Sequence, residues 1–315
     1  MGRTPDCPVN GALLASLRLD NPPSANEGKE DAMGTQTLDE QKRVIYEIAE
    51  AIAPTWERRR ADVEEVATPV REWMLRELRP QEGDTVLELA AGVGETGFEA
   101  ATIVGETGRL ITSDFSPAML GAARRRGAEL GVANAAYLII DAERIELDDD
   151  SVDGVLCRFG YMLTADPAAA LRETRSVLRP GGRLTLAVWG ALERNPFFAI
   201  IGISLVQRGH IPPPEPPPAP GAFSMASTER LDGLMRDAGF ADVRVEEVHG
   251  RFAIPDVEEY LSVIADTAGP IALALQGLED ADLAAVRADV EDSLGRFAAD
   301  GGYELPCVAL CAVAS

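Results

Sequence analysis

Three glycines and one acid stand at a spacing that fits a nucleotide-like ligand. Gly92, Gly94 and Gly97 follow a short apolar run, and Asp114 ends the next one. This spacing matches the G-x-G-x-x-G turn of dinucleotide-binding folds, with Asp114 about where a ribose-binding acid belongs. Such glycines permit a tight turn, close approach of the backbone to a ligand, and close packing of helix on strand. Because strand, turn, helix and acid occur in register, we favour a ligand site over glycines that serve packing alone.

The carboxylates around this turn discriminate between ligands. Glu88 precedes the glycines and Glu95 lies among them, where a pyrophosphate would be repelled. Asp141 ends the third apolar run, where it can accept a hydrogen bond from an adenine amino group. A ligand with adenine, ribose and a cationic amino-acid end suits these groups better than one with phosphates. They therefore predict S-adenosylmethionine (SAM) rather than a nicotinamide dinucleotide.

The elements that must hold these residues alternate between strands and helices. Short apolar runs end at a glycine turn or a charged residue, and amphipathic segments with capping residues separate them. The expected strands are 84–90, 109–114, 136–141, 152–158, 183–189, 241–248 and 305–314. This alternation predicts an α/β fold with a doubly wound, mostly parallel seven-stranded sheet, covered by helices on both faces.

Changes in composition divide the chain into five parts. In chain order we expect a flexible leader (1–35), an N-terminal helical lid (36–80), a SAM-binding α/β core (81–190), a cap segment with a Pro-rich loop (191–226), and a C-terminal part of the sheet (227–315) with a helical insertion (256–300) over the acceptor site. The lid begins at a capping box formed by Thr37 and Glu40. Its aromatic residues Tyr46 and Trp56 either cover the cofactor or pack in the core.

Several segments together resemble the class I SAM-dependent methyltransferases. VLELAAGVGETG (86–97) resembles their first motif, and ITSDFSPAML (111–120) is similar to the segment with their second acidic position. The stretches 139–163 and 166–189 resemble later motifs of the ubiquinone/menaquinone-type methyltransferases. The resemblance covers residues 80–190, and the combination is far more specific than any one motif.

The resemblance implies a contact with SAM for each matching residue. The implied residues are Glu88, Ala90, Gly92 and Gly94 at the methionine part, Asp114, Phe115 and Met119 at ribose and adenine, Asp141 and Ala142 at the adenine edge, and Arg158 and Gly160 at the sulfonium. Glu88 would orient the ammonium indirectly, Asp114 would accept from the ribose hydroxyls, and Asp141 from the adenine amino group. The main-chain carbonyls of Arg158 and Gly160 would favour the charge of the sulfonium.

Methyl transfer from a sulfonium requires alignment and a dry pocket more than a catalytic group. If the acceptor must lose a proton, the candidate catalytic residues are His249, after the sixth strand, and Tyr161, after the fourth. The alternative for His249 is an ordinary surface position. Trp189, Asn195 and Phe197 are expected to face the acceptor.

Composition restricts the partners. Asp and Glu number 52 against 29 Lys and Arg, a net charge of −23, which argues against nucleic acid. The four cysteines are too far apart for a zinc knuckle or a redox pair, so no metal is expected. No apolar stretch reaches the roughly 18 residues that span a bilayer. These features predict a cytoplasmic protein with a small-molecule acceptor, and they leave a homodimer open.

The favoured function is therefore SAM-dependent methylation of an apolar or aromatic small molecule, a quinone-like compound or a secondary metabolite, at oxygen or carbon. Two alternatives remain open at this point. One is a non-catalytic regulator that binds SAM or another metabolite. The other is an NAD(P)-dependent oxidoreductase built on the same turn.

Overall fold

A single mixed sheet forms the centre of the protein, in a computed structural model that describes residues 27–213 and 220–315. Its strands are β1 (Thr85–Glu88), β2 (Arg109–Asp114), β3 (Ala135–Ile139), β4 (Val152–Arg158), β5 (Leu178–Trp189), β6 (Arg244–Ile254), β7 (Ala298–Ala299) and β8 (Gly302–Ala314). Their order in the sheet is β3-β2-β1-β4-β5-β8-β6, and the two-residue β7 pairs with β8. The chain divides into two units, Met1–Thr37 and Leu38–Ser315, and the sheet belongs to the second.

The sheet confirms the predicted doubly wound topology. Strands β1 to β5 pair in parallel, whereas β8 runs antiparallel between β5 and β6. The seven expected strands are all present, and β7 is an addition to them. The strand order reverses beside β1, whose neighbours are β2 and β4, and ligands of such sheets bind at the carboxyl ends of strands at this switch point.

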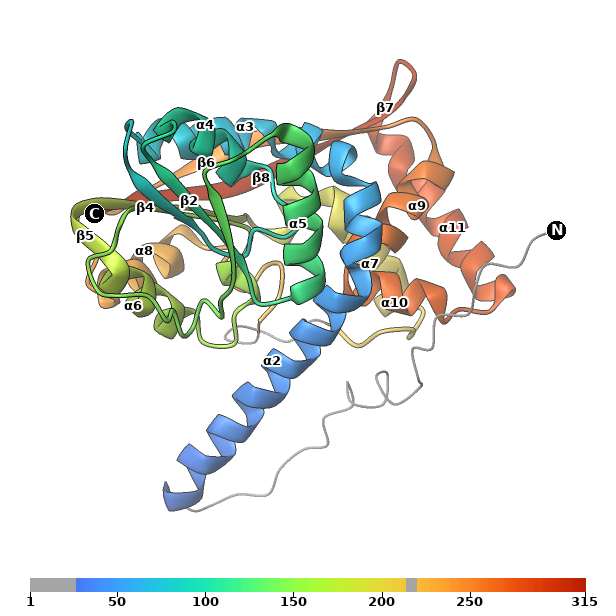
Figure 1. The fold of residues 1–315 in the computed structure, drawn as a ribbon. Helices are drawn as coiled ribbons and strands as arrows, with labels where there is room; N and C mark the ends of the chain where they lie inside the picture. The colour runs from blue at the N-terminus through green and yellow to red at the C-terminus, as the bar shows by residue number, and fades with distance from the viewer. Residues whose placement is uncertain (1–26, 214–219) are drawn as a thin grey trace. The chain divides into compact units, whose positions relative to one another are not determined.

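Helices cover both faces of the sheet. Their bounds are α3 (Arg60–Leu78), α4 (Thr96–Val104), α5 (Pro117–Leu130), α6 (Pro167–Val177) and α8 (Thr228–Asp237). Figure 1 shows α3 and α4 on the upper side of the strands and α6 and α8 on the lower side. Strand β4 contributes side chains to both faces of the sheet. Leu156 packs under α3 and α4, and Val155 packs on the opposite face.

The helix that precedes this core is longer than predicted. Helix α2 (Glu27–Arg58) begins ten residues before Thr37, so Thr37 and Glu40 lie inside it and do not form its N-terminal capping box. Residues 27–35 of the predicted leader are helical, and its first 26 residues lie outside the described part of the chain. Helix α2 also continues through Pro54 to Arg58.

A second apolar cluster forms at one end of the sheet. It joins α7 (Pro196–Gln207), α9 (Val257–Thr267), α10 (Pro270–Gln276) and α11 (Asp280–Leu294). The end of α2 is attached to α9, because the Trp56 Nε1–H donates to the Thr267 carbonyl at 3.0 Å and Arg59 pairs with Asp266 at 2.8 Å. Most of the Pro-rich loop, residues 214–219, lies outside the described residues.

The junction of α6 and β5 also differs from expectation. The strand expected at 183–189 begins five residues earlier, because α6 ends at Val177 and β5 starts at Leu178. The register against β4 then jumps, since Leu178 lies opposite Val152 and Arg183 opposite Gly154. Gly181 has φ of 84°, so the two glycines belong to a bulge within the strand.

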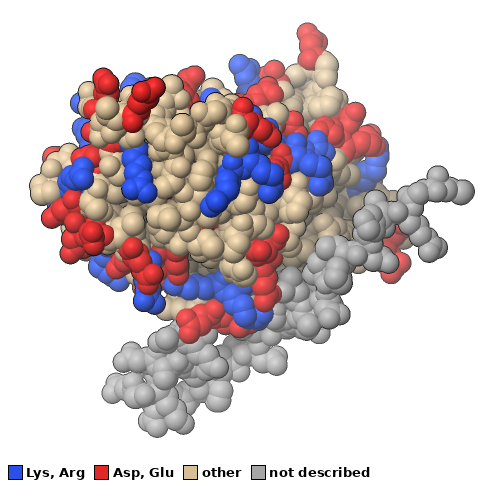
Figure 2. Space-filling view, in the orientation of Figure 1, with Lys and Arg blue, Asp and Glu red and all other residues tan. Residues whose placement is uncertain are grey.

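The surface mixes both signs of charge. Figure 2 shows Lys and Arg side chains scattered among Asp and Glu on the visible face. Within residues 27–213 and 220–315, no helix is long and apolar enough to cross a membrane. In the same ranges, no group of three or more His, Cys, Asp or Glu side chains is arranged to hold a metal ion.

Candidate cofactor and acceptor site

The glycine loop between β1 and α4 has an unusual backbone. Ala90 (φ 51°), Gly92 (φ 57°) and Gly94 (φ 82°) all adopt the left-handed region. A Cβ on Gly94 would lie 2.4 Å from the Phe98 ring, so this glycine is required for packing. A Cβ on Gly92 would meet nothing within 4 Å. The main chain at Gly92 therefore borders open space in which a ligand can approach it.

Glu88 ends β1 beneath this loop and is almost completely buried, with 4% of its surface exposed. Its Oε1 accepts a hydrogen bond from the Gly97 N–H at 2.7 Å, whereas Oε2 has no partner among the described residues. Burial raises the pKa of Glu88 to about 7, although the Gly97 N–H and the charge of Arg158 act in the opposite direction. A buried carboxylate oxygen without a donor suits the cationic end of a ligand.

Asp114 ends β2 and contacts the glycine loop. Its Oδ2 accepts from the Gly92 N–H at 2.8 Å, and its Oδ1 accepts from the Ser116 N–H at 2.9 Å. Burial raises the pKa of Asp114 to about 6 despite these two hydrogen bonds. The side chain thus holds the glycine loop against the start of α5.

The predicted adenine partner, Asp141, already has a cationic partner from α2. Lys42 Nζ lies 2.9 Å from Asp141 Oδ2 and 2.8 Å from Glu143 Oε2. The other oxygen of Asp141 accepts from the Glu143 N–H at 2.9 Å. An adenine amino group would therefore share Asp141 with Lys42 or displace it. Ala142 lies between the two acids in this turn.

The residues expected to contact adenine lie under the same helix. Phe115 makes an edge-to-face contact with Tyr46, with ring centroids 5.8 Å apart. Met119 is buried in a small apolar cluster with Val93 of the glycine loop, and Trp56 packs against that cluster. Tyr46 and Trp56 thus both contact the cofactor side of the molecule, through Phe115 and through the Met119 cluster.

One further residue of α2 contacts this region. Glu50 Oε1 accepts from the Ser116 hydroxyl at 2.6 Å and from the Ala118 N–H at 3.0 Å. These donors belong to the first turn of α5, where a carboxylate is favoured by the helix dipole. Lys42 and Glu50 were not among the predicted site residues.

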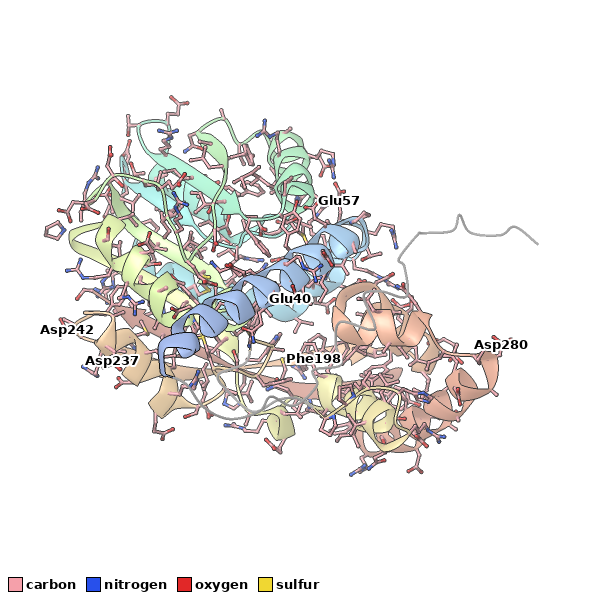
Figure 3. The ribbon with its side chains drawn as sticks, turned by 90° about the horizontal axis from the view of Figure 1, so that it is seen from below. Glu40, Glu57, Phe198, Asp237, Asp242 and Asp280 are labelled. Atoms are coloured by element: carbon pink, nitrogen blue, oxygen red, sulfur yellow. The ribbon has the colours of Figure 1, made fainter. Side chains whose placement is uncertain are left out.

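The contacts of α2 come from one side of the helix. Lys42, Tyr46 and Glu50 are spaced four residues apart, which places them on one face. Figure 3 shows this part of α2 crossing the core between the labelled Glu40 and Glu57. The four-residue spacing of a lysine, an aromatic residue and an acid is the sequence signal that could have identified this face.

Arg158 ends β4 next to Glu88. Its Nη2 forms an ion pair with Glu64 of α3, and Glu64 is also bound by Arg71 at 2.7 Å. Its Nη1 is buried and has no hydrogen-bond partner among the described residues. The side chain of Arg158 therefore has a free donor in addition to the main-chain carbonyl on which the prediction rested.

The loop after β4 packs directly on the glycine loop. A Cβ on Gly160 would lie 2.5 Å from the Ala90 Cβ and 2.7 Å from the Cys157 sulfur, so only glycine fits there. Phe159, just before it, has φ of 60°, which is rare for a bulky residue. Strained backbone of this kind concentrates at functional sites, and here it immediately precedes Gly160, which packs on the glycine loop.

Five aromatic residues extend from this point and are here called the aromatic wall. They are Phe159, Trp189, Phe198, Phe223 and Phe252, all partly exposed. Phe159 and Trp189 are stacked, with centroids 4.2 Å apart and planes 14° apart. Trp189 lies 5.2 Å from Phe198, which lies 5.9 Å from Phe223, centroid to centroid. Figure 3 labels Phe198 on this wall. The wall therefore begins at the residue that precedes Gly160, which packs on the glycine loop.

The two predicted catalytic residues do not lie in this wall. Tyr161 is fully buried, its hydroxyl lies 2.5 Å from Thr174 Oγ1, and burial raises its pKa well above the usual range. Such a phenol packs the core and is not accessible to an acceptor. His249 lies on the edge strand β6 with 65% of its side chain exposed, 3.6 Å from Glu247. These positions argue against both catalytic roles.

Asn195 and Phe197, expected to face the acceptor, require a correction. Asn195 is fully buried, and its amide donates to the carbonyls of Gly190 and Val308 while accepting from the Val308 N–H. Both polar atoms of its side chain are therefore occupied, and both contact β8 at Val308. Phe197 is buried as well, stacked on Phe252 in the apolar cluster of α7, α9, α10 and α11. Of the three residues, only Trp189 is in the aromatic wall.

The argument from Glu95 also changes. Its carboxylate is paired with Arg126 at 2.6 Å and with Arg60 at 3.1 Å, so its charge is compensated. Repulsion of a pyrophosphate therefore rests on Glu88 and not on both acids. The two arginines come from α5 and α3, and they hold the glycine loop from outside.

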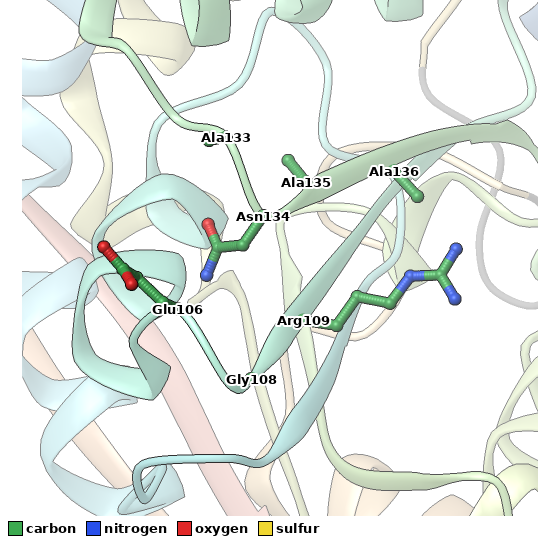
Figure 4. Close-up of a pocket in the computed structure, with 7 residues that line it drawn as sticks. All are labelled: Glu106, Gly108, Arg109, Ala133, Asn134, Ala135 and Ala136. Carbon is green, nitrogen blue, oxygen red and sulfur yellow. The ribbon is translucent and has the colours of Figure 1, made fainter.

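A shallow pocket lies away from this site, at the amino-terminal ends of β2 and β3. Figure 4 shows its lining, which is Glu106, Gly108, Arg109, Ala133, Asn134, Ala135 and Ala136. Ligands of doubly wound sheets bind at the carboxyl ends of the strands. This pocket is at the wrong edge of the sheet for the cofactor.

Part of the chain is similar to known methyltransferases. Residues 68–195 match the ubiE/COQ5 methyltransferase family. The demethylmenaquinone methyltransferase of Clavibacter sepedonicus is 33% identical over 135 residues, which are 43% of this chain and 49% of that protein. The ubiquinone/menaquinone biosynthesis C-methyltransferase UbiE of Enterobacter sp. (strain 638) is 36% identical over 105 residues, which are 33% of this chain and 42% of that one. The match thus spans about half, or less, of these relatives.

A solved structure agrees with the fold. The YcgJ protein of Bacillus subtilis is 20% identical, with a TM-score of 0.51 over 78% of this chain and 96% of that chain. Within residues 68–195, the resemblance to SAM-dependent methyltransferases is confirmed, and SAM is confirmed as the cofactor of this kind of domain. The comparisons support neither the oxidoreductase nor the non-catalytic regulator.

Proposed function

We propose that this chain, whose residues 68–195 are a SAM-dependent methyltransferase domain of the ubiE/COQ5 type, transfers a methyl group from SAM to an apolar or aromatic small molecule. A quinone-like compound or a secondary metabolite is the favoured acceptor class. The observation that carries this proposal is the aromatic wall, because it begins at Phe159, whose neighbour Gly160 touches Ala90 of the cofactor loop.

The contacts around the glycine loop support the assignment of the cofactor-binding residues. Asp114 accepts from the N–H of Gly92, and we assign it the ribose hydroxyls. Glu88 leaves one buried carboxylate oxygen for the cationic end, and the main chain at Gly92 is open to a ligand. In this proposal Phe115 and Met119 pack on the adenine.

The chemistry assigned to the protein is mostly alignment. SAM supplies an activated methyl group on its sulfonium when bound. The aromatic wall would hold the acceptor against the cofactor loop and exclude water, which favours an in-line displacement. With Tyr161 buried and His249 exposed, we expect turnover that does not depend on either side chain. An acceptor with an acidic hydroxyl or an electron-rich ring carbon fits such a site best.

Two properties of the relatives favour the quinone-like acceptor. They are named for demethylmenaquinone and for ubiquinone/menaquinone biosynthesis, and UbiE is named a C-methyltransferase. Carbon methylation of an aromatic ring also agrees with a wall of π-faces. Oxygen methylation of a phenol is the alternative outcome of an acceptor screen.

The first test is thermal unfolding with SAM, S-adenosylhomocysteine (SAH) and NADH. A ligand at about 100 times its dissociation constant adds roughly 2.7 kcal/mol, which raises Tm by several degrees. We expect a shift with SAM and SAH and none with NADH. A shift with NADH alone would overturn the proposal. Release of SAH that depends on an added hydroquinone or phenol then separates an enzyme from a protein that only binds SAM.

The remaining expectations concern partners and location. A small-molecule acceptor follows from the proposed activity. Absence of nucleic-acid partners, a cytoplasmic location and a homodimer remain predictions from the sequence. Light scattering of the purified chain measures the oligomeric state directly.

A further inference from the structure

Two buried polar atoms of opposite charge lack partners where β1 and β4 end. They are Oε2 of Glu88 and Nη1 of Arg158, and neither has a hydrogen bond within the described ranges. An unpartnered buried polar group costs free energy, and few of them occur in native proteins. A ligand that carries both charges would give each of these two atoms a partner.

The sheet places the two side chains on the same face. In the β1–β4 pairing, Glu88 lies opposite Leu156, two residues before Arg158. Leu156 packs in the layer of α3 and α4, and residues two apart on a strand share a face, so Arg158 points into that layer. Glu88 does as well, since it receives the Gly97 N–H of α4. The charge of Arg158 lowers the pKa of Glu88, as expected for neighbours.

Each side chain is oriented by a single anchor that leaves the other polar atom free. Glu64 holds Nη2 of Arg158 and is itself held by Arg71 at 2.7 Å. The Gly97 N–H holds Oε1 of Glu88 at 2.7 Å. A guanidinium fixed in this way presents its remaining N–H groups in a rigid fork, which is well suited to a carboxylate.

The other cations around the glycine loop are not available for this role. Arg60 and Arg126 are both paired with Glu95, and Lys42 is paired with Asp141 and Glu143. Arg158 is the arginine beside β1 that keeps a buried nitrogen without a partner in the described part of the chain.

We propose that the side chain of Arg158 binds the α-carboxylate of the cofactor's amino-acid end through Nη1, opposite Glu88, which faces the ammonium. This inference rests on the proposed function, and it assigns Arg158 a role beyond its main-chain carbonyl. Arg158 and Glu88 together would favour a ligand whose amino-acid end carries both a carboxylate and an ammonium. The same adenosyl ligand with an amine but no carboxylate would bind more weakly.

Calorimetric titration of the full chain with two ligands tests the proposal. The ligands are SAH and its decarboxylated analogue, which keeps the amine and lacks the carboxylate. A hydrogen-bonded charge pair of this kind is worth about 10- to 100-fold in affinity. We expect the wild type to prefer SAH by about that factor. Arg158→Met should lose the preference by weakening SAH alone, and Arg158→Lys should retain part of it.

Arg208→Met is the matched control, because Arg208 pairs with Asp289 at 2.7 Å and contacts neither the glycine loop nor Glu64. It should change the affinity for both ligands by less than about threefold. If Arg158→Met weakens the binding of both ligands equally, the role of Arg158 is structural and the inference is overturned. Arg158→Met that binds SAH with the affinity of the wild type would also overturn it. If Arg158→Met does not fold, the wild-type preference and Arg158→Lys decide the question.

The two proposals fail in different ways. A wild type that binds both adenosyl ligands with equal affinity overturns the role of Arg158 and leaves the methyltransferase assignment intact. A wild type that binds neither ligand overturns the proposed function and this inference together.

Discussion

Replacement of Glu88 by glutamine should remove a large part of the protein's pH dependence of stability. Glu88 is buried, and its burial raises its pKa to about 7 from the ordinary 4.5. The folded protein therefore holds this proton to a higher pH than the unfolded chain does. The stabilisation from the proton is complete below about pH 4.5 and is lost as the pH rises to about 7.

The magnitude follows from the displacement of the pKa. Raising a pKa from 4.5 to about 7 corresponds to about 3 kcal/mol of unfolding free energy between the two limits. Glu88→Gln keeps an oxygen for the Gly97 N–H and has no proton to lose. Its unfolding free energy should fall by about 2.5 kcal/mol less than that of the wild type between pH 5 and pH 8. Asp114, whose pKa of about 6 gives a slope of the same sign, is present in both proteins.

Urea unfolding at half-unit pH steps, followed by tryptophan fluorescence, measures this difference. Asp289→Asn is the control, because Arg208 holds the pKa of Asp289 down to about 2, so that it stays ionised in the folded protein throughout this range. This control should keep the wild-type slope.

Equal slopes for the wild type and Glu88→Gln would refute the reasoning, because Glu88 would then be ionised at pH 5 in the folded protein. A second arm uses SAH. Its ammonium favours the ionised form of Glu88, so SAH should bind more tightly as the pH rises from 5 to 7. Glu88→Gln should lose that rise.

Three further substitutions test the site. Asp114→Asn should weaken SAH binding by about tenfold or more, measured by calorimetry, because the carboxylate that accepts two N–H groups and is proposed to bind ribose becomes an amide. Unchanged affinity would exclude the ribose role. Trp189→Ala should raise KM for an aromatic acceptor by about tenfold while the Kd of SAH stays constant, because it removes the ring stacked on Phe159; a parallel loss of SAH affinity would contradict an acceptor role. Tyr161→Phe should cost about 1 kcal/mol of stability through the lost contact with Thr174, yet keep kcat within about twofold; a loss of kcat with normal folding would restore the catalytic role.

The core of the fold could be predicted from the sequence because its strands are short and buried on both faces. Such strands appear as continuous apolar runs, and here they end at Glu88, Asp114 and Arg158. The start of α2 could not be predicted from the sequence, because residues 27–36 carry no apolar periodicity to mark a helix. The glycines at 181–182 suit both a helix end and a bulge, and only pairing with β4 decides between them.

The site was predictable where motif and strand end coincide, and not where distant segments meet. Lys42 and Asp141 are 99 residues apart, and Glu64 and Arg158 are 94 apart. No local pattern reports such pairs. Tyr161 was misjudged because a loop position after a strand suggested accessibility, whereas its apolar neighbours place it in the core.

The face of α2 that carries Lys42, Tyr46 and Glu50 has a thermodynamic consequence. Its contacts are Asp141, Phe115 and the first turn of α5, which are the positions assigned to adenine and ribose or next to them. Docking of this helix and occupancy by an adenosyl ligand therefore act on the same groups. If a bound ligand changes the equilibrium constant for docking of α2 by some factor, docking of α2 changes the affinity for the ligand by the same factor. This holds because coupling between two binding equilibria is reciprocal.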